Sequence, residues 1–550
     1  MHRRQVRPSS VVALAAVLTG VLGVAPAASA ESLNASPAAR EAHAAALSTT
    51  VPEPAQDPVR PGFTRSRYEI PITISPGANI NKITANNIPK PPGNVYLVRM
   101  TPNLVIDDRD SNPANDRVPR TDVVHLHHMV WVVNDPDSSR PRGFNLPFGA
   151  GEEKTVVQLP EGYGYPVYSN QRWVINDMLH NLTPATIKAK IVYTLDWTPM
   201  DSTLGRSLKP AYPLWLDVKR GSGYPVFDTF AGTGNNGTIT FPDQFSNPYP
   251  GLASSPALWT ANRNLTLLAT AGHVHPGGLR TDLEVIRAGA NGSASPQPGT
   301  LPNSARAFRS NGVYWDPAGP ISWDMAMEAT PPDWRVHVKP GDKLKISATY
   351  ETVKGDWYES MGIMVVWAAL DSTDGADPFT DQIDWNGGEP THGSYEENKN
   401  YGGKITTMKD PRRQQRGVSP AASTIRIKNF VYQYGDLSLS GMAGRPAIVK
   451  KGKSLKFLNQ DAGSTASLKD IYHSITDCAA PCNKDTGPSY PLANGPRTFD
   501  SGQLGFGFIA PGDPTARRLT WETPKNLNAG TYTYFCRVHP FMRGAFRVVN

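Results

Sequence analysis

Cysteine is nearly absent from this chain: there are three in 550 residues, and residues 31–477 contain none. This excludes a disulfide-rich scaffold, so core packing must hold the fold together. After the first thirty residues, no apolar run approaches the ~20 residues that a membrane-spanning helix needs. Clusters of Lys and Arg interleaved with aromatic residues are also missing, and the formal net charge is only +7. Nucleic acid is therefore not an expected partner.

Helical periodicity is lacking as well. Runs of Val, Ile, Thr and Tyr are separated by turn-forming stretches that draw on 51 prolines and 48 glycines. This composition predicts an all-β protein built from β-sandwiches. The length is that of roughly three ordinary domains.

The N-terminus has the features of a secretory signal. In residues 1–30, Arg3 and Arg4 precede an apolar run, and Ala28-Ser-Ala30 offers a small-residue cleavage site. We therefore expect a secreted or extracytoplasmic protein, with Sec and twin-arginine export both open. Residues 31–62 are rich in Ala and Pro and predict a flexible leader.

Near the C-terminus, three soft metal ligands lie within seven residues: Cys536, His539 and Met542. A trigonal set of two histidines and one cysteine with a weak axial methionine is the ligand set of blue-copper electron-transfer sites. The second histidine must come from upstream, and His473 is the only one nearby. Strand-like sequence flanks the loop on both sides, so the ligands are expected at the end of a hairpin.

This loop resembles that of the cupredoxins, and is most similar to amicyanin and plastocyanin-like domains. The resemblance implies that residues 421–550 form a Greek-key sandwich that holds one type 1 copper. With Cys536 used as a ligand, Cys478 and Cys482 remain four residues apart. In an oxidising compartment they are expected to form a local disulfide, and a metal site is the alternative.

Six further histidines lie upstream in metal-binding patterns. A strand-like segment holds His125, His127 and His128, which are costly to bury without hydrogen bonds or a metal. Alternation places His125 and His127 on one face and His128 on the other, unless a β-bulge intervenes. The remaining three are His180 and the pair His273-Val-His275, whose spacing on a strand points both rings to one side.

The order of these motifs along the chain resembles that in the copper type II, ascorbate-dependent monooxygenases. The resemblance implies two coppers, one held by His127, His128 and His180 and one held by His273, His275 and Met361. The second copper would bind O2 and oxidise the substrate, which makes His273, His275 and Met361 the expected catalytic residues. The family fold implies two consecutive antiparallel, jelly-roll-like sandwiches at residues 63–245 and 246–372, facing each other across a cleft.

Some assignments in this region stay open. His125 is an alternative ligand to His128, or a residue that orients a ligand. Met364 is a competing thioether, but alternation places it on the other face from Met361. His337 is expected to be an ordinary strand residue, and His392 a hydrogen-bonded turn residue. Residues 373–420 are polar and predict a linker.

The chain departs from the family at its substrate-binding positions. Peptidylglycine enzymes hold a substrate carboxylate with Arg, Asn and Tyr, where this sequence has Ala271, Ile363 and Val365. A glycine-extended peptide is therefore not expected as substrate.

Together, these patterns predict an exported copper oxidoreductase with about three coppers per chain. Its partners would be O2, an unidentified small-molecule or peptide-like substrate, and a redox protein or small-molecule reductant. The alternative is a copper-binding electron-transfer or copper-storage protein whose sandwiches are not catalytic. A multicopper oxidase or copper nitrite reductase is disfavoured, because the His-Cys-His signature and further His-x-His pairs are missing.

Overall fold

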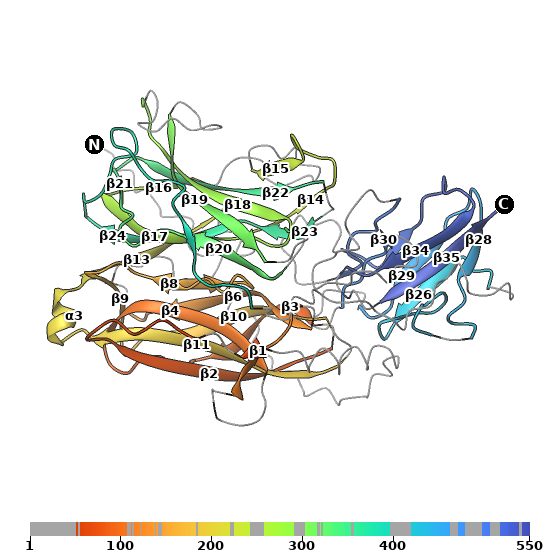
Figure 1. Ribbon diagram of the computed structural model, residues 1–550, viewed down its shortest axis with the longest axis horizontal. Helices are drawn as coiled ribbons and strands as arrows, with labels where there is room; N and C mark the ends of the chain where they lie inside the picture. The colour runs from red at the N-terminus through yellow and green to blue at the C-terminus, as the bar shows by residue number, and fades with distance from the viewer. Residues whose placement is uncertain are drawn as a thin grey trace, which may run out of the picture.

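The computed structural model describes residues 51–52, 55–76, 78–106, 112, 115–121, 123–137, 139–140, 146–182, 185–219, 225–242, 258–290, 303–315, 319–320, 323–353, 357–395, 420–439, 441–462, 471–478, 498–506, 517–537, 539 and 542–550. Within these ranges the protein is almost entirely β-structure, as the sequence predicts, and the one helix is α3 (Thr203–Ser207). No helix among the described residues is long and apolar enough to cross a membrane. Figure 1 shows the strands gathered into three units. The predicted signal peptide, residues 1–30, lies outside the described residues.

The first unit packs two sheets around one core. Its larger sheet has the order β1-β5-β4-β11-β2 with β8, β9 and β12 attached, and comprises β1 (Val51–Pro52), β2 (Thr64–Ile74), β4 (Val95–Ile106), β5 (Arg117–Val118), β8 (Val157–Gln158), β9 (Tyr163–Val167), β11 (Ile187–Pro199) and β12 (Lys209–Pro210). Its smaller sheet has the order β3-β10-β6-β7, and comprises β3 (Asn79–Asn86), β6 (Val124–Asn134), β7 (Phe148–Ala150) and β10 (Arg172–Asn181). Trp131, Trp173 and Tyr193 are fully buried in the core.

The second unit is built on an eleven-stranded sheet. Its main path runs β13-β24-β17-β20-β19-β18-β22-β15, with β13 (Tyr212–Asp217), β15 (Thr238–Phe241), β17 (Leu265–His273), β18 (Gly278–Ile286), β19 (Ser304–Tyr314), β20 (Met325–Ala329), β22 (Lys343–Glu351) and β24 (Ile363–Leu370). Three short strands attach to it, namely β16 (Leu258–Thr260), β21 (Val336–Val338) and β25 (Glu389–Pro390). A separate antiparallel pair joins β14 (Val226–Thr229) to β23 (Trp357–Met361).

The boundaries of the first two units differ from those predicted. Strand β13 pairs with β24 and β15 pairs with β22, so sequence before residue 245 already belongs to the second unit. The predicted leader, residues 31–62, and the predicted linker, residues 373–420, also overlap with the folded units. Asp57 forms an ion pair with Arg99 at 2.9 Å, and Thr266 Oγ1 donates to the Asp374 carbonyl at 2.7 Å. Asp57 of the predicted leader and Asp374 of the predicted linker therefore pack on the folded units.

The third unit is a small two-sheet sandwich. One sheet has the order β27-β26-β29-β33, with β26 (Thr424–Lys428), β27 (Val431–Tyr432), β29 (Lys456–Asn459) and β33 (Thr520–Glu522). The other has the order β28-β35-β34-β30, with β28 (Ala447–Lys450), β30 (Thr476–Cys478), β34 (Gly530–Phe535) and β35 (Arg543–Val549). A further pair joins β31 (Gly505–Phe506) to β32 (Arg517–Arg518). Parallel pairs, β26 with β29 and β28 with β35, occur among the antiparallel ones.

The first two units pack directly against each other. The ring of Trp367 from the second unit lies 5.5 Å from that of Phe148 and 5.3 Å from that of Tyr165, both in the first. Leu268 and Ala369 of the second unit also belong to the core cluster of the first. The third unit lies at one end of the two sandwiches, on the side where β3, β14 and β23 are found (Figure 1).

Candidate metal centres

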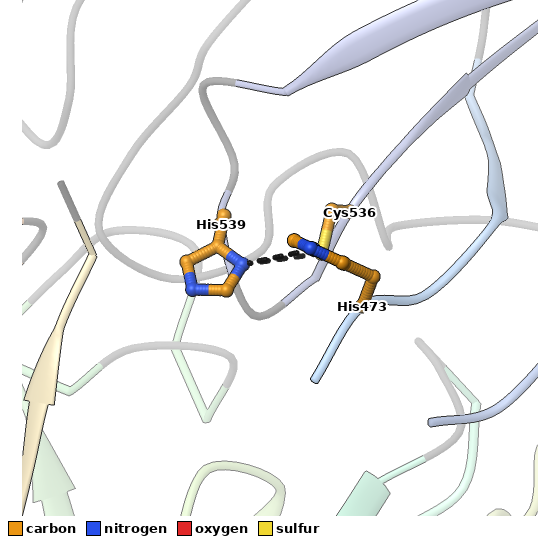
Figure 2. Close-up of side chains that lie close together, drawn as sticks. All are labelled: His473, Cys536 and His539. Carbon is orange, nitrogen blue, oxygen red and sulfur yellow. Dashed lines mark hydrogen bonds between the residues drawn. The ribbon is translucent and has the colours of Figure 1, made fainter. Parts of the chain in front are cut away.

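Three of the predicted ligands come together in the third unit. Cys536 follows β34, while His473 lies before β30 in the same sheet. Cys536 Sγ is 3.8 Å from His473 Nδ1 and 3.7 Å from His539 Nδ1, and the two nitrogens are 3.3 Å apart. All three side chains are fully buried. Figure 2 shows both imidazoles turned toward the sulfur.

The dimensions of this triad fit a metal ion. A point equidistant from three atoms separated by 3.3, 3.7 and 3.8 Å lies about 2.1 Å from each of them, within the ~2.0–2.3 Å range of metal–nitrogen and metal–thiolate bonds. A buried set of two imidazole nitrogens and one thiolate is the donor set of a type 1 copper site. We call these three residues the Cys536 triad.

The ligand loop is closed by its own backbone. Cys536 N donates to the Met542 carbonyl at 3.1 Å, and Met542 N donates to the His539 carbonyl at 2.9 Å. Strands β34 and β35 pair on either side of the loop, with Phe535 opposite Arg543. The loop is therefore at a hairpin end, as the flanking sequence predicted. Met542 is buried in the same core cluster as Cys536, and its role as axial ligand stays a prediction.

Neighbouring groups orient the triad. Asp461 Oδ2 lies 2.9 Å from His473 Nε2, so this ring donates its Nε2 proton to the carboxylate and directs Nδ1 at Cys536. Ser474 N donates to Cys536 Sγ at 3.3 Å, which stabilises charge on the sulfur. Asn459 accepts a bond from Asp461 N at 2.9 Å and so positions the carboxylate. The sequence alone did not identify these supporting roles.

Electrostatics favour the metal-binding protonation state of the cysteine. Burial by itself would raise the pKa of the Cys536 thiol, but hydrogen bonds from His473 and His539 lower it to about 5. Burial opposes charge on His473 too, yet its hydrogen bonds to Asp461 and Cys536 raise its pKa to about 9. The thiolate is the form of cysteine that binds metals. The thiolate form of Cys536 is therefore favoured, and a bound ion would take the place of the proton on His473 Nδ1.

A second group of histidines lies between the first two units. The register of β10 on β6 pairs Met178 with His128 and Leu179 with Leu126, so His127 is the extra residue of a β-bulge. The centroid of the His127 ring lies 4.4 Å from that of His180. Across the interface, it lies 4.0 Å from the centroid of the His275 ring. The structure thus joins histidines of both predicted copper sites into one cluster.

His125 orients His180. His125 Nδ1 lies 2.7 Å from the Thr121 carbonyl, which only accepts, so the ring carries its proton on Nδ1. His125 Nε2 then accepts from His180 Nδ1 at 2.9 Å, which leaves a lone pair on His180 Nε2. Of the two roles left open for His125, this geometry favours orienting a ligand over being one. Trp323 stacks on His125 at 4.1 Å and holds the ring from its other face.

His273 and His275 are arranged as a chelating pair. Glu153 lies 3.0 Å from His273 Nδ1, and the Glu359 carbonyl accepts from His275 Nδ1. Because both Nδ1 atoms face acceptors, both Nε2 atoms carry lone pairs, and they lie 3.1 Å apart. Two nitrogens at this spacing can both bind one ion at ~2.0 Å. The His-x-His spacing therefore produces the geometry that it predicted.

Met361 lies at the end of β23, next to the chelating pair. The Tyr350 hydroxyl accepts from His275 N and from Met361 N, at 2.9 Å each, and donates to the Met361 carbonyl at 2.7 Å. One phenol thus ties the two predicted ligands together through their backbones. Met364 instead lies in the main core of the second unit, as alternation predicts. Whether the Met361 sulfur binds a metal stays a prediction.

His128 lines a small recess of about 50 Å³ together with His273 and Glu153. Burial lowers the pKa of His128 to about 3, so the ring is neutral. The rest of the lining is mostly apolar, and includes Phe148, Trp215, Ala271, Ile363 and Val365. The three positions at which the sequence lacks carboxylate anchors therefore all face this recess.

Four residues of this region were not identified from the sequence: Glu152, Glu153, Trp323 and Glu359. Glu152 accepts from Leu126 N at 2.7 Å, beside the bulge. Glu359 supplies a carboxylate oxygen that lies, with ring nitrogens of His127 and His180, in a group spanning no more than 4.8 Å. No sequence pattern links Glu152 and Glu153 to the histidines, and none predicts a metal role for Glu359. The one local signal is the Glu-Glu-Lys run at 152–154, which is buried here although charged residues are rarely buried.

The histidine cluster approaches the Cys536 triad. Burial first, and then the neighbouring imidazoles of His125 and His539, lower the pKa of His180 well below its ordinary value. His539 therefore lies close enough to His180 for the two rings to interact electrostatically.

The remaining predicted residues have simpler surroundings. His337 Nε2 lies 3.1 Å from Asn264 Oδ1 in β21, as expected for a strand residue. His392 contacts the carbonyls of Gly393 and Glu153, as expected for a turn residue. Cys478 lies in β30, but Cys482 lies outside the described residues, so their disulfide stays a prediction.

Comparisons with protein-family models and with curated proteins found no match. Among solved structures, the chain is similar to the Cu(I) form of an amicyanin mutant, at 18% identity over 26% of this chain and 92% of that one, with a TM-score of 0.14. It is also similar to a Cu-containing nitrite reductase from Thermus scotoductus, at 15% identity over 52% of this chain and 55% of that one, with a TM-score of 0.15. A broad bean stain virus structure matches at 11% identity, over 62% and 96% of the two chains, with a TM-score of 0.22.

These scores are low, so the assignment of the third unit rests on its own strands and ligands. It is a cupredoxin-like domain: a two-sheet sandwich with a buried two-histidine, one-cysteine set at a hairpin end. Its donor set is the one found in copper electron-transfer sites.

Proposed function

We propose that this chain is an exported copper-dependent oxidoreductase whose cupredoxin-like unit passes electrons to copper bound between the two sandwiches. The observation that carries the proposal is the Cys536 triad, with donor atoms 3.3–3.8 Å apart beside a cluster of buried histidines. A protein that only stored or carried copper would need the triad alone. In the cleft, neighbouring acceptors hold the Nδ1 protons of several histidines, so their Nε2 atoms carry the lone pairs. This arrangement favours a second redox site there.

The electrostatic influence of His539 on His180 supports direct electron delivery. His539 belongs to the triad, and the tautomer of His180 is fixed by His125 so that its Nε2 is available to a metal. Electrons would then move between neighbouring imidazoles within one chain. No exchangeable carrier would be needed for this internal step.

The finer proposal is an O2-dependent monooxygenase reaction in the cleft. Copper held by His273 and His275, with Met361 as a soft third ligand, would supply the O2 and one-electron chemistry. His127 and His180, with His128 as predicted or with another donor, would hold the second ion. Glu153 and the Glu359 carbonyl keep protons on the Nδ1 atoms of the ligand pair, and so present Nε2 to the site.

The recess beside His273 indicates the class of substrate. It is lined mostly by apolar side chains, and its volume of about 50 Å³ suits a group of only a few heavy atoms. Ala271, Ile363 and Val365 cannot bind a carboxylate. We therefore propose that an apolar, uncharged group of a small molecule enters here to be oxidised.

Copper counting tests the proposal. The copper-loaded full-length protein, the same protein with Cys536→Ser, and the same protein with His275→Ala should bind about three, two and two coppers per chain. The Cys536→Ser variant should also lose the visible thiolate-to-copper absorption, which His275→Ala should keep. A single copper that Cys536→Ser removes entirely would contradict a redox site in the cleft and favour simple electron transfer.

A further inference from the structure

We propose that Glu359 is a metal ligand, and that the centre around His127 and His180 is a two-histidine, one-carboxylate site rather than a three-histidine site. A ring nitrogen of each histidine and a carboxylate oxygen of Glu359 all lie within 4.8 Å of one another, and all three side chains are buried. The inference goes beyond the proposed function and does not rest on it, because such a site can hold an ion whether or not a substrate is oxidised.

The distances are compatible with one shared ion. His127 Nε2 lies 4.0 Å from Glu359 Oε2, and two ligands that each lie ~2.1 Å from an ion can be up to ~4.2 Å apart. The rings of His127 and His180 are stacked at 4.4 Å, with 30° between their planes. A small inward shift of the side chains would bring the three donor atoms to bonding distance.

The two histidines are prepared as metal ligands. The bonds from His125 to Thr121 and from His180 to His125 place the proton of His180 on Nδ1 and a lone pair on Nε2. His127 Nδ1 is buried and makes no hydrogen bond among the described residues. A buried imidazole is costly unless hydrogen bonds or a metal satisfy its ring nitrogens.

The backbone of Glu359 is held in an unusual conformation. Its φ is 55°, in the left-handed region that is disfavoured for a residue with a Cβ. The Asp228 carboxylate accepts from Glu359 N at 3.2 Å, and the Glu359 carbonyl accepts from His275 Nδ1. Such conformations persist only where the surroundings enforce them, and they concentrate at binding sites.

Glu359 would therefore serve both centres in the cleft. Its carboxylate faces His127, while its carbonyl fixes the tautomer of His275. His128, in contrast, lines the recess beside His273 and is not in the group formed by His127, His180 and Glu359. If Glu359 moves when an ion binds near His127, the hydrogen bond from His275 Nδ1 to the Glu359 carbonyl would change as well.

The donor set also indicates the ion. Two imidazoles and a carboxylate suit borderline divalent ions such as Zn²⁺, Fe²⁺ or Cu²⁺, whereas Cu(I) prefers softer ligands. His127 and His180 lie on β6 and β10 of the first unit, and Glu359 lies on β23 of the second. A bound divalent ion would therefore join the two units directly.

Zinc titration tests the assignment. Isothermal titration calorimetry would be run on the metal-free full-length chain, with Cys536→Ser in every arm to remove the thiolate site. We expect Glu359→Gln to weaken one Zn²⁺ equivalent 10-fold or more, and Glu359→Asp to weaken it less because it keeps the carboxylate. His128→Ala tests the competing three-histidine site, and we expect it to leave that equivalent unchanged. Visible spectra of the Co²⁺-loaded protein should change with Glu359→Gln and not with His128→Ala.

The opposite pattern would overturn the proposal. If His128→Ala removes this equivalent while Glu359→Gln binds as the parent does, the site is formed by three histidines. Thermal melting of the metal-free variants shows whether Glu359→Gln is folded, and if it is not, Glu359→Asp and His128→Ala decide the question. Failure here is distinguishable from failure of the proposed function, which depends on the copper count and on the Cys536 absorption.

Discussion

Replacing Asp461 with Asn should loosen the metal of the third unit while leaving the sandwich folded. The carboxylate accepts three bonds, from His473 Nε2 at 2.9 Å, Phe430 N at 3.0 Å and Asn429 N at 2.5 Å. An amide has one oxygen, so at least one donor would face an NH2 group. If that donor is His473 Nε2, the ring loses its Nε2 proton first and keeps the proton on Nδ1, the atom that faces Cys536.

The size of the effect follows from these contacts. A hydrogen bond to a charged group contributes ~1.5–3 kcal/mol, and loss of a group that orients a metal-binding histidine lowers affinity ~10–100-fold. We therefore expect a 10–100-fold weaker metal affinity, equivalent to about 1.4–2.7 kcal/mol. Asp461→Asn should also lower the pKa of His473, because the Asp461 hydrogen bond is the largest contribution that raises it.

Competition with a chelator, followed by the visible thiolate–metal absorption, measures this affinity. The matched control is Asp477→Asn in β30 of the same unit, which removes a carboxylate that accepts from Thr498 N at 2.8 Å. The control should bind metal as the parent does. An Asp461→Asn affinity within twofold of the parent would refute the orienting role of Asp461.

Three further predictions follow from the same contacts. His125→Phe keeps a ring stacked on Trp323 but removes the acceptor for His180 Nδ1. In zinc titrations, the metal affinity of the cleft should therefore fall ~10–100-fold. The thiolate-to-copper absorption of Cys536 should be unchanged. Chelation of the metal should lower the melting temperature, because an ion present at 100 times its Kd adds about 2.7 kcal/mol to the free energy of unfolding; equal melting curves would argue against bound metal. Burial raises the pKa of Asp436 to about 6, above its unfolded value. Its contribution to the free energy of unfolding is therefore present at low pH. About 3 kcal/mol of this contribution is lost as the pH rises through 6. Denaturant titrations across this pH range should show that Asp436→Asn removes the loss.

Much of the fold and of the third-unit site could be predicted because their signals are local in sequence. Alternating β-branched and polar residues predicted strands throughout. Cys536 and His539 lie three residues apart in a hairpin loop, so chain geometry alone brings them together. In the same way, the spacing of His273 and His275 placed both rings on one side of the chain.

The features that could not be predicted depend on tertiary contacts. Glu359 lies far in sequence from His127 and His180, and only the packing of β23 against the first unit brings it near them. The bulge at His127 requires the register of β10 on β6, which the sequence does not show. The boundary prediction near residue 245 relied on a Pro- and Asn-rich stretch, but that stretch lies between two strands of one unit, β15 and β16. Turn composition marks loops, whether or not a domain ends there.

The central claim is that electrons entering at the Cys536 triad move on to metal in the cleft of the same molecule. Flash reduction of the fully oxidised, copper-loaded protein with less than one electron per chain tests it most directly. The thiolate-to-copper absorption should bleach first and then recover in a first-order process whose rate does not change with protein concentration. A bleach that does not recover, or that recovers at a rate proportional to protein concentration, would contradict the account.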